Sequence, residues 1–352
     1  MRQILHITLL VAVFLMTSRN LDCQEAEHGG GLLIMNWNLE NYFDWIDGGY
    51  SDSDAEFSSR GAKRWTKSRF MAKSNAIAKT ILWIGDRYGR IPDIVCFEEV
   101  ENRHVLRRLL EDTALRKKDY RIVHFDSPDK RGIDVALLYR SGVFEALETR
   151  AVQVGDTAVF RTRDILLARL ERRCDGKTLS ALVNHHPSKF GGGESDWKRM
   201  AAVEAMKAVI DSLRTAGEDF IIAAGDFNDT PENRVLGLVS CEYGDTAAIR
   251  NGKLVNLALP LVRSGRGTIR FNGKWEIIDM FLVSGAVADA GAVMEIVEVP
   301  FLLTHDNTHS GDKPLRTYLG PRYLGGVSDH LPVVMRITAR PYRRVLRQGG
   351  RE

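Results

Sequence analysis

The sequence contains many short apolar runs of strand length and few segments with helical spacing, and this inventory restricts the fold more than any other feature. The strand-like runs lie at residues 32–37, 94–97, 120–125, 133–139, 163–170, 178–184, 220–224, 277–283, 293–298 and 332–337. Helical spacing is visible after Thr66, around 105–110 and over about 195–214. Strand-like runs that outnumber helices and occur in mixed order argue against a doubly wound parallel sheet. We therefore predict an α/β fold in which two sheets pack face to face with helices outside.

Four of the apolar runs are flanked by polar side chains that suit catalysis or metal binding. These residues are Asn36 and Asn38, Glu98 and Glu99, Asp226, Asn228 and Asp229, and Ser328, Asp329 and His330. Carboxylate and amide oxygens are the ligands that Mg²⁺, Mn²⁺ and Ca²⁺ prefer, and histidines such as His185 and His330 exchange protons near pH 7. The sequence has no GxGxxG, P-loop, HExxH or GxSxG motif, so dinucleotide, nucleoside-triphosphate, zinc-protease and serine-hydrolase chemistry has no support.

Each polar group has a plain structural alternative when it is taken alone. An asparagine after a strand, such as Asn38, is common in turns, and the Glu98–Glu99 pair suits the first turn of a helix. Residues 226–229 suit a turn that caps a helix, and His185 before a His-Pro pair suits a structural turn. The four groups together are harder to explain by turns and caps, which favours a functional site.

The first 23 residues have the pattern of an export signal. Arg2 precedes a 13-residue stretch, Ile4 to Met16, that is apolar at all but two positions. This stretch is shorter than the roughly 20 residues that span a bilayer, and it fits the apolar part of a signal peptide. We expect residues 1–23 to be removed from a protein that is secreted or acts in the periplasm or at the cell surface, without a stable membrane span. A lipoprotein anchor at Cys23 and a plain buried helix are the alternatives.

Charge is distributed unevenly between the body of the chain and its end. The whole chain carries +3, residues 340–352 carry +4 and residues 1–23 carry +1, which leaves 3 − 4 − 1 = −2 for residues 24–339. Such a body has no general basic surface for clamping long duplex DNA. Without repeats or linkers, residues 24–340 are expected to form one monomeric domain, followed by a basic tail at 341–352.

Seven strings along the chain resemble the endonuclease/exonuclease/phosphatase superfamily and occur in that family's order. They are MNWNLEN at 35–41, PDIVCFEEVEN at 92–102, RGIDVALLY at 131–139, VNHHPSK at 183–189, AAGDFND at 223–229, IIDMFLVS at 277–284 and SDHLPV at 328–333. The resemblance implies the deoxyribonuclease-I-like fold, a four-layer α/β sandwich with two mixed β-sheets packed face to face and helices outside. The first string and the loop around Trp65 also resemble the branch of secreted bacterial extracellular nucleases.

The resemblance implies a metal site and gives its residues. Asn38 and Glu99 match the family's metal-binding pair, and Asp329 matches a residue at or beside the metal. The implied cofactor is Mg²⁺, with Mn²⁺ or Ca²⁺ as alternatives. Glu98 stands where some relatives have glutamine, so two acids are adjacent here.

The same resemblance assigns the catalytic groups. Asp226 and Asn228 match the pair that orients the attacking water and the phosphate. His330 matches the terminal histidine, which Asp279 orients through a hydrogen bond. His185 matches the mid-chain histidine that contacts the phosphate or serves the leaving group. Either Asp226 or His330 takes the proton of the water.

These assignments imply a secreted, divalent-metal-dependent phosphoesterase, and we expect a phosphodiesterase or nuclease that hydrolyses nucleic-acid phosphodiester bonds. The alternatives are a sphingomyelinase-like or inositol-phosphate-like phosphatase that acts on another phosphate ester, and a catalytically dead binding module on the same fold. Arg161, Arg163 and Lys189 are expected either to contact phosphate or to be surface charges. Residues 301–327 show little periodicity and are expected to form a long loop that shapes substrate choice.

Overall fold

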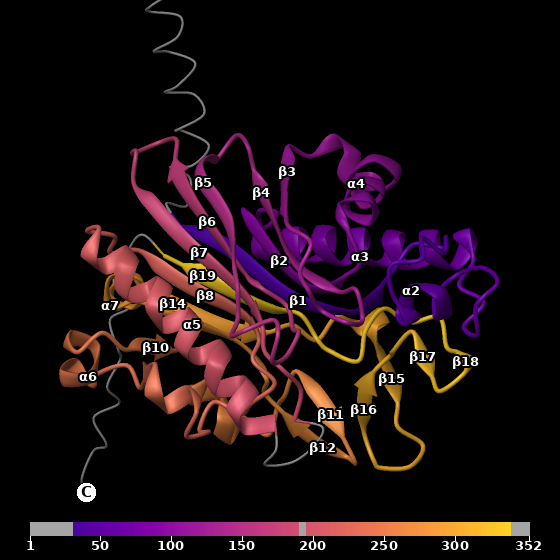
Figure 1. Cartoon of the computed structure of the whole chain (residues 1–352). Coiled ribbons are helices and arrows are strands. Elements are labelled where there is room, and N and C mark those ends of the chain that lie inside the picture. The colour runs from indigo at the N-terminus through magenta and orange to yellow at the C-terminus, as the bar shows by residue number, and fades with distance from the viewer. Residues whose placement is uncertain (1–30, 190–194, 339–352) are drawn as a thin grey trace, which may run out of the picture.

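Two large β-sheets form the centre of the protein (Figure 1). The computed structural model describes residues 31–189 and 195–338, so the expected signal peptide and basic tail lie outside the described residues. The first sheet has the strand order β14-β19-β1-β2-β4-β3. Its strands are β1 (Leu32–Tyr42), β2 (Ile94–Val100), β3 (Tyr120–His124), β4 (Asp134–Arg140), β14 (Ala292–Ile296) and β19 (Val333–Ile337). Because β1 pairs parallel with β2 and antiparallel with β19, this sheet is mixed.

The second sheet has seven strands in the order β5-β6-β7-β8-β13-β10-β9. They are β5 (Phe144–Val152), β6 (Ile165–Arg172), β7 (Thr178–His185), β8 (Ile221–Asp226), β9 (Ser240–Cys241), β10 (Leu254–Asn256) and β13 (Asp279–Val283). It is also mixed, because β8 pairs parallel with β7 and antiparallel with β13.

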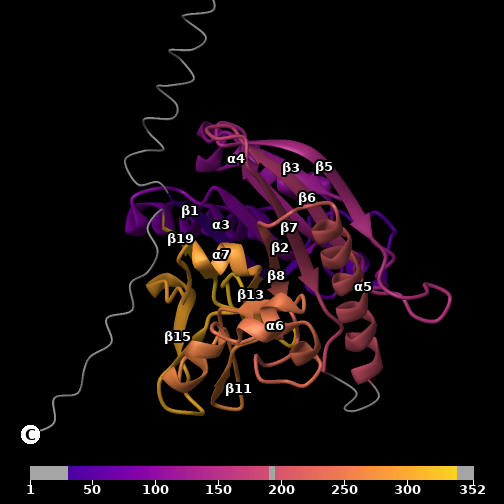
Figure 2. The same cartoon turned by 90° about the vertical axis from the view of Figure 1, so that its left-hand side faces the viewer.

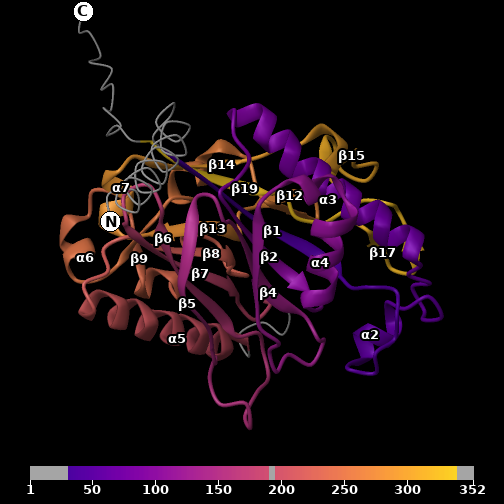
Figure 3. The ribbon, with the colours of Figure 1, turned by 90° about the horizontal axis from the view of Figure 1, so that it is seen from above.

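Side-chain alternation along β1 connects the layers. Leu32 and Ile34 belong to the core that includes both sheets, whereas Leu33 and Met35 point to the other face, into a second core beneath the helices at 67–88 and 103–112. The helices are α2 (Asp52–Glu56), α3 (Lys67–Tyr88), α4 (Arg103–Asp112), α5 (Asp196–Thr215), α6 (Thr246–Arg250) and α7 (Gly285–Asp289). Figure 3 shows α3 and α5 on opposite sides of the sheets. The four-layer sandwich expected from the sequence is therefore confirmed.

The sequence explains where α3 begins and ends. The Thr66 side chain accepts a hydrogen bond from the backbone N–H of Arg69 at the start, and Gly89 ends the helix with φ of 73°. Phe70, Ile77 and Ile81 repeat at helical spacing and are buried against the first sheet. The helix predicted to begin after Thr66 is confirmed.

Two regions differ from the expectation. β5 was not predicted, because it is a half-exposed strand at the edge of its sheet and has no apolar run. The segment 301–327 is not an unstructured loop, because it contains two small sheets. These pair β15 (Leu303–His305) with β16 (Asp312–Pro314) and β17 (Tyr318–Leu319) with β18 (Arg322–Tyr323). A third pair, β11 (Ile269–Phe271) with β12 (Lys274–Glu276), lies at the same end of the molecule (Figures 1 and 2).

Gly225 lies in the middle of the second sheet, where only glycine fits. Its φ is +152°, and a Cβ there would lie 2.0 Å from the backbone oxygen of Asn184 on β7. β8 cannot move away from β7 to make room, because it also pairs with β13 on its other side. The fold therefore requires glycine at the position immediately before Asp226.

We predict that Gly225→Ala lowers the free energy of unfolding by roughly 3 kcal/mol, because it combines a steric clash with backbone strain. Gly217→Ala is the matched control, since Gly217 has φ of 85° but no atom within 4 Å of the added Cβ. That control is expected to cost roughly 1–2 kcal/mol. Urea denaturation followed by circular dichroism measures both values, and equal losses would contradict the clash with Asn184.

Candidate active site

Three polar side chains lie side by side on one rung of the second sheet. His185 of β7 and Asp279 of β13 are both register partners of Asp226 on β8. Residues at the same register share a face of a sheet, and all three are buried. The Nε2 atom of His185 lies 3.6 Å from Oδ2 of Asp226. Strand pairing thus assembles a histidine and two carboxylates from segments nearly 100 residues apart.

Side chains from the first sheet meet this rung from the opposite side. Asn38 Nδ2 donates a hydrogen bond of 3.1 Å to Asp226 Oδ2. His330, just before β19, places Nδ1 2.8 Å from Asp279 Oδ2 and Nε2 4.0 Å from Asp226 Oδ2. A carboxylate at Nδ1 orients the ring and fixes the proton on that nitrogen, which leaves Nε2 facing Asp226.

Burial and the neighbouring charges determine the protonation states of Asp226 and His330. Burial and the neighbouring Asp279 raise the pKa of Asp226 to about 7, against the opposing effects of His330 and two hydrogen bonds. Burial alone would lower the pKa of His330, but Asp279 and Asp226 outweigh it and raise that pKa well above its usual value. The geometry therefore favours an imidazolium at His330.

His185 has the opposite character. Burial, followed by the positive charges of Arg163 and Arg131, lowers its pKa well below the usual value. Its Nδ1 has no hydrogen-bond partner among the described residues. His185 is therefore a neutral imidazole, and this ring nitrogen is buried without a partner.

Glu98 is a buried acid of the site to which the sequence analysis gave no role. It shares a rung with Asn38, and its Oε1 has no hydrogen-bond partner among the described residues. Burial, then Asp279 and Asp226, raise its pKa well above the usual value. The neutral acid is therefore favoured, which is the form most similar to the glutamine of some relatives.

The backbone is distorted where β1, β2 and β8 end. Four of the six non-glycine residues with positive φ among the described residues lie here: Glu40 (47°), Asn41 (55°), Glu99 (59°) and Asn228 (49°). Pairing between β1 and β2 shifts register over the same positions. Glutamate rarely adopts this conformation, and such strain persists where surrounding contacts hold it.

Glu99 and Asp329, the two acids predicted to bind metal, each pair with an arginine. Arg131 Nη2 lies 3.2 Å from Glu99 Oε2, which also accepts the backbone N–H of Asn41. Arg316 Nη2 lies 2.9 Å from Asp329 Oδ2. Burial alone would raise the pKa of Glu99, but Arg131 and the hydrogen bonds outweigh it and lower that pKa.

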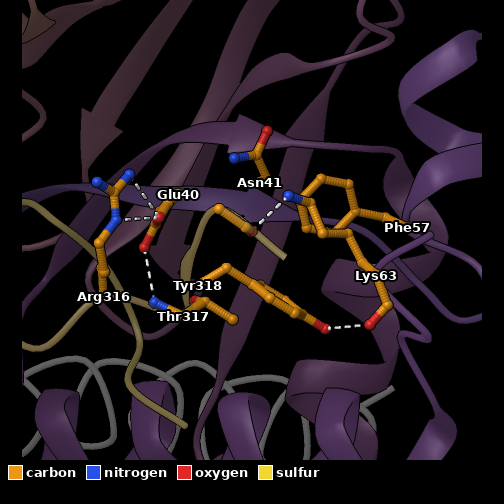
Figure 4. Close-up of a pocket in the computed structure, with 8 residues that line it drawn as sticks. Glu40, Asn41, Phe57, Lys63, Arg316, Thr317 and Tyr318 are labelled. Atoms are coloured by element: carbon orange, nitrogen blue, oxygen red, sulfur yellow. Dashed lines mark hydrogen bonds and ion pairs between the residues drawn. The ribbon is translucent and has the colours of Figure 1, made fainter. Parts of the chain in front are cut away.

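Glu40, which Figure 4 shows with Arg316, is a third acid and shares that arginine with Asp329. Its carboxylate accepts hydrogen bonds from Arg316 Nε and from the backbone N–H of Thr317. Burial and then Asp329 raise the pKa of Glu40 to about 7. The buried Lys73 donates to the Glu40 carbonyl at 2.6 Å, and burial lowers the pKa of Lys73 to about 8.

A small cavity of about 140 Å³ opens next to this group. Its lining residues are Glu40, Asn41, Phe57, Lys63, Arg316, Thr317, Tyr318 and Gly320. Figure 4 shows these side chains around the cavity, with Tyr318 donating a hydrogen bond to the Lys63 carbonyl. Four of them belong to the 301–327 segment, so this segment borders the site as expected.

The donor atoms fit a hard divalent cation. Asn38, Glu99 and Asp329 offer oxygen ligands and no sulfur. Glu99 and Asp329 both raise the pKa values of Arg131 and Arg316, so the two acids lie in the same part of the site. A second set, formed by Asp226, Asp279 and His330, has ligand atoms within 4.8 Å of one another. The Oδ1 atom of Asp279 has no partner among the described residues. Which set holds the cation stays a prediction.

The remaining predicted residues have mainly positioning contacts. The backbone N–H of Asn228 donates to Asp226 Oδ1, and its Nδ2 donates to the His186 carbonyl. Arg163 is buried and connects Asp129 to the same carbonyl. Lys189 lies 3.4 Å from Glu276. Arg163 is therefore neither a surface charge nor free for phosphate, which corrects both expectations for it.

Lys73, Arg131 and Arg316 were not singled out as site residues by the sequence. Arg131 opens the RGIDVALLY string and Arg316 lies in the 301–327 segment, so both stood in regions already noted. Lys73 gave no signal, because a lysine in an amphipathic helix is ordinarily exposed.

Known proteins share this sequence pattern and fold. The Endonuclease/Exonuclease/phosphatase family model matches residues 33–339. Protein Angel of Drosophila melanogaster is 28% identical over 200 residues, which are 55% of this chain and 54% of Angel. The chain therefore spans about half the length of that relative.

Two solved structures illustrate the fold. The mannosyl-6-phosphatase of Bacteroides thetaiotaomicron VPI-5482 has 15% identity and a TM-score of 0.52 over 86% of this chain and 98% of that chain. D. rerio TDP2 in complex with a single-strand DNA product has 14% identity and a TM-score of 0.50 over 87% and 98%. The chain belongs to the endonuclease/exonuclease/phosphatase family, whose members hydrolyse phosphate esters.

Proposed function

We propose that the protein is a divalent-metal-dependent phosphodiesterase that hydrolyses nucleic acid. The observation that carries this proposal is the buried arrangement of His330, Asp279 and Asp226 beside the acids Glu99 and Asp329. It combines an oriented imidazole, a carboxylate with a pKa near neutrality and a separate set of oxygen ligands. In-line hydrolysis of a phosphate ester needs these three components.

The chain's own groups account for the proton movements. A water attacks phosphorus as the bond from phosphorus to the leaving oxygen breaks, Asp226 accepts the water's proton, and the leaving oxygen takes up a proton from the solvent. His330, held by Asp279, places a positive Nε2 toward the developing charge on the phosphate. Neutral His185 lies on the same rung and donates a hydrogen bond to the phosphate or the leaving group. A cation held by Asn38, Glu99 and Asp329 would supply charge neutralisation at the phosphate.

Nucleic acid is the preferred substrate for two reasons. The string at 35–41 and the loop around Trp65 resemble those of secreted bacterial nucleases, and a protein of this fold, D. rerio TDP2, has been solved with a DNA product. The rival is a phosphatase or lipid phosphodiesterase, since the fold also occurs in a mannosyl-6-phosphatase. A dead binding module is disfavoured, because all five predicted catalytic residues are present and four of them, Asp226, Asn228, Asp279 and His330, are held by hydrogen bonds.

We also propose that the protein is exported. The apolar stretch Ile4 to Met16 after Arg2 supports this, together with its length. No helix in the described ranges 31–189 and 195–338 has the length and apolar character to cross a membrane. Mass spectrometry of the mature N-terminus after expression with the full chain tests cleavage after Cys23.

The first functional prediction concerns the metal ligands. Glu99→Gln and Asp329→Asn are each expected to weaken Mg²⁺ binding by at least about tenfold, because each removes a charged oxygen ligand. Isothermal titration calorimetry of the purified protein, stripped with EDTA, measures this affinity. Glu148→Gln, which removes a surface acid paired with Arg150 and Arg169, is the matched control and should change nothing. Loss of binding in Asp279→Asn but not in Glu99→Gln would place the cation in the other cluster.

A second prediction concerns the imidazole. His330→Ala is expected to lower kcat by about 10²-fold or more, the scale of a lost proton-transfer or charge-stabilising group. His124→Ala is the matched control, since His124 is also buried and lies 3.1 Å from an aspartate, Asp134, outside the site. Its effect on kcat should be under threefold. Equal effects of the two variants on kcat and on stability would indicate a structural role for His330.

The substrate class is decided by a direct screen of the mature protein with Mg²⁺ or Mn²⁺. We expect release of products from single- or double-stranded oligonucleotides, and at least about 10²-fold lower kcat/KM on sugar phosphates, inositol phosphates and sphingomyelin. Asp226→Asn serves as the inactive control, since it removes the acceptor of the water's proton. Efficient release of phosphate from a monoester, or of a lipid headgroup, without cleavage of nucleic acid would contradict the nuclease and favour a phosphatase or lipid phosphodiesterase.

A further inference from the structure

A groove outside the active site is lined mainly by cations. It lies between α4, the 3₁₀ turn η1 (Ala114–Lys117) and β3, which is the edge strand of the first sheet. Its volume is about 480 Å³, and its lining residues are Arg103, Arg107, Leu110, Glu111, Arg116, Lys118, Tyr120, Arg121 and Ile122. Figures 1 and 2 both show α4 beside β3.

Most of these cations have no acidic partner. Arg107 lies 3.5 Å from Glu111. Arg103, Arg116, Lys118 and Arg121 are exposed, and no carboxylate of the described residues lies within 4.0 Å of their charged groups. Exposed cations that stay unpaired next to one another repel, so this arrangement favours an anionic ligand.

The local charge contrasts with that of the whole domain. Residues 103–121 contain seven Arg or Lys and three Asp or Glu, a net charge of 7 − 3 = +4, whereas residues 24–339 carry −2. A positive patch on a slightly acidic body concentrates a polyanion at one place rather than over the whole surface. The floor of the groove, formed by Leu110, Tyr120 and Ile122, adds an apolar surface.

We propose that this groove binds the sugar–phosphate backbone of a nucleic-acid strand at a distance from the cleavage site. The inference rests on the proposed function, because the bound strand is the substrate. Arg103 follows Glu99 by four residues, so one end of α4 starts next to the strand end that carries the predicted metal ligand. The ten residues of α4 are about 15 Å long, which is the length of about four nucleotides of a strand at 3.4 Å each.

A membrane surface is a poorer partner for this groove. Binding to lipid headgroups normally combines cations with apolar side chains that insert into the bilayer. Within the described residues, none of the exposed large hydrophobic side chains belongs to 103–122. The groove therefore has the charge for a polyanion without the anchor for a bilayer.

The test measures binding of a fluorescent 20-nucleotide oligothymidylate to the full chain in EDTA, where cleavage does not interfere. The double variant Arg116→Glu, Lys118→Glu is expected to weaken binding at least tenfold at low salt. Loss of two phosphate contacts should also reduce the slope of log K against log salt by about 1.4, at about 0.7 per phosphate on single strands.

The matched control reverses two exposed arginines that do not line the groove, Arg250 of α6 and Arg263, with the same change in charge. It should weaken binding less than twofold. Both double variants should cleave a dinucleotide as the wild type does, since neither touches the active site. Circular dichroism verifies that both are folded.

Four outcomes decide the proposal. Selective loss of 20-mer binding in Arg116→Glu, Lys118→Glu supports the groove, even if the wild type cleaves no nucleic acid and the proposed function fails. Wild-type affinity in this variant overturns the groove, even if the protein is an active nuclease. Equal weakening in both double variants overturns it in favour of a general charge effect. Binding to phosphatidylserine vesicles that depends on Arg116 and Lys118, without oligonucleotide binding, overturns it in favour of a lipid surface.

Discussion

The structure depends on the pairing of polar groups that are buried between two sheets. An ionised carboxylate or imidazole away from water is costly unless a partner satisfies it. Asp279 Oδ2 pairs with His330 and Asp226 Oδ2 accepts from Asn38, and both contacts cross from one sheet to the other. A shift of β13 by one residue would turn Asp279 to the opposite face. The contacts of the active site therefore also fix how the two sheets are aligned.

The layer around these groups holds the backbone in an unfavourable conformation. Glu40 and Glu99 both have positive φ, yet each carboxylate is fastened by an arginine, Arg316 or Arg131. Lys73 fastens the Glu40 carbonyl from the side of α3. These three basic side chains offset the charges of Glu40, Glu99 and Asp329 and hold the strained backbone of Glu40 and Glu99 in place.

Much of the fold could be predicted because most of its strands are buried and therefore apolar in sequence. β5 and the small sheets within 301–327 could not be predicted. A half-exposed edge strand has no apolar run, and strands of two or three residues are too short to show an alternating sequence pattern. The strand-end acids and histidines were visible in the sequence and are brought together as neighbours. Their partners Arg131 and Lys73 were not, since only the tertiary fold brings these two cations to Glu99 and to the Glu40 carbonyl. The basic groove was also hidden, because the net charge of the domain averages a patch of +4 with acidic surroundings.

The order of the strands has a consequence for synthesis of the chain. β19 lies between β1 and β14, so the last large strand of the described chain inserts beside the first. His330 and Asp329 come immediately before it, and the Trp37 ring donates a hydrogen bond to the His330 carbonyl across 293 positions of sequence. A nascent chain emerges from the ribosome N-terminus first, so it carries Asn38, Glu99 and Asp226 long before it has His330 to complete them. The proposed active site is therefore complete only after nearly the whole domain has been synthesised.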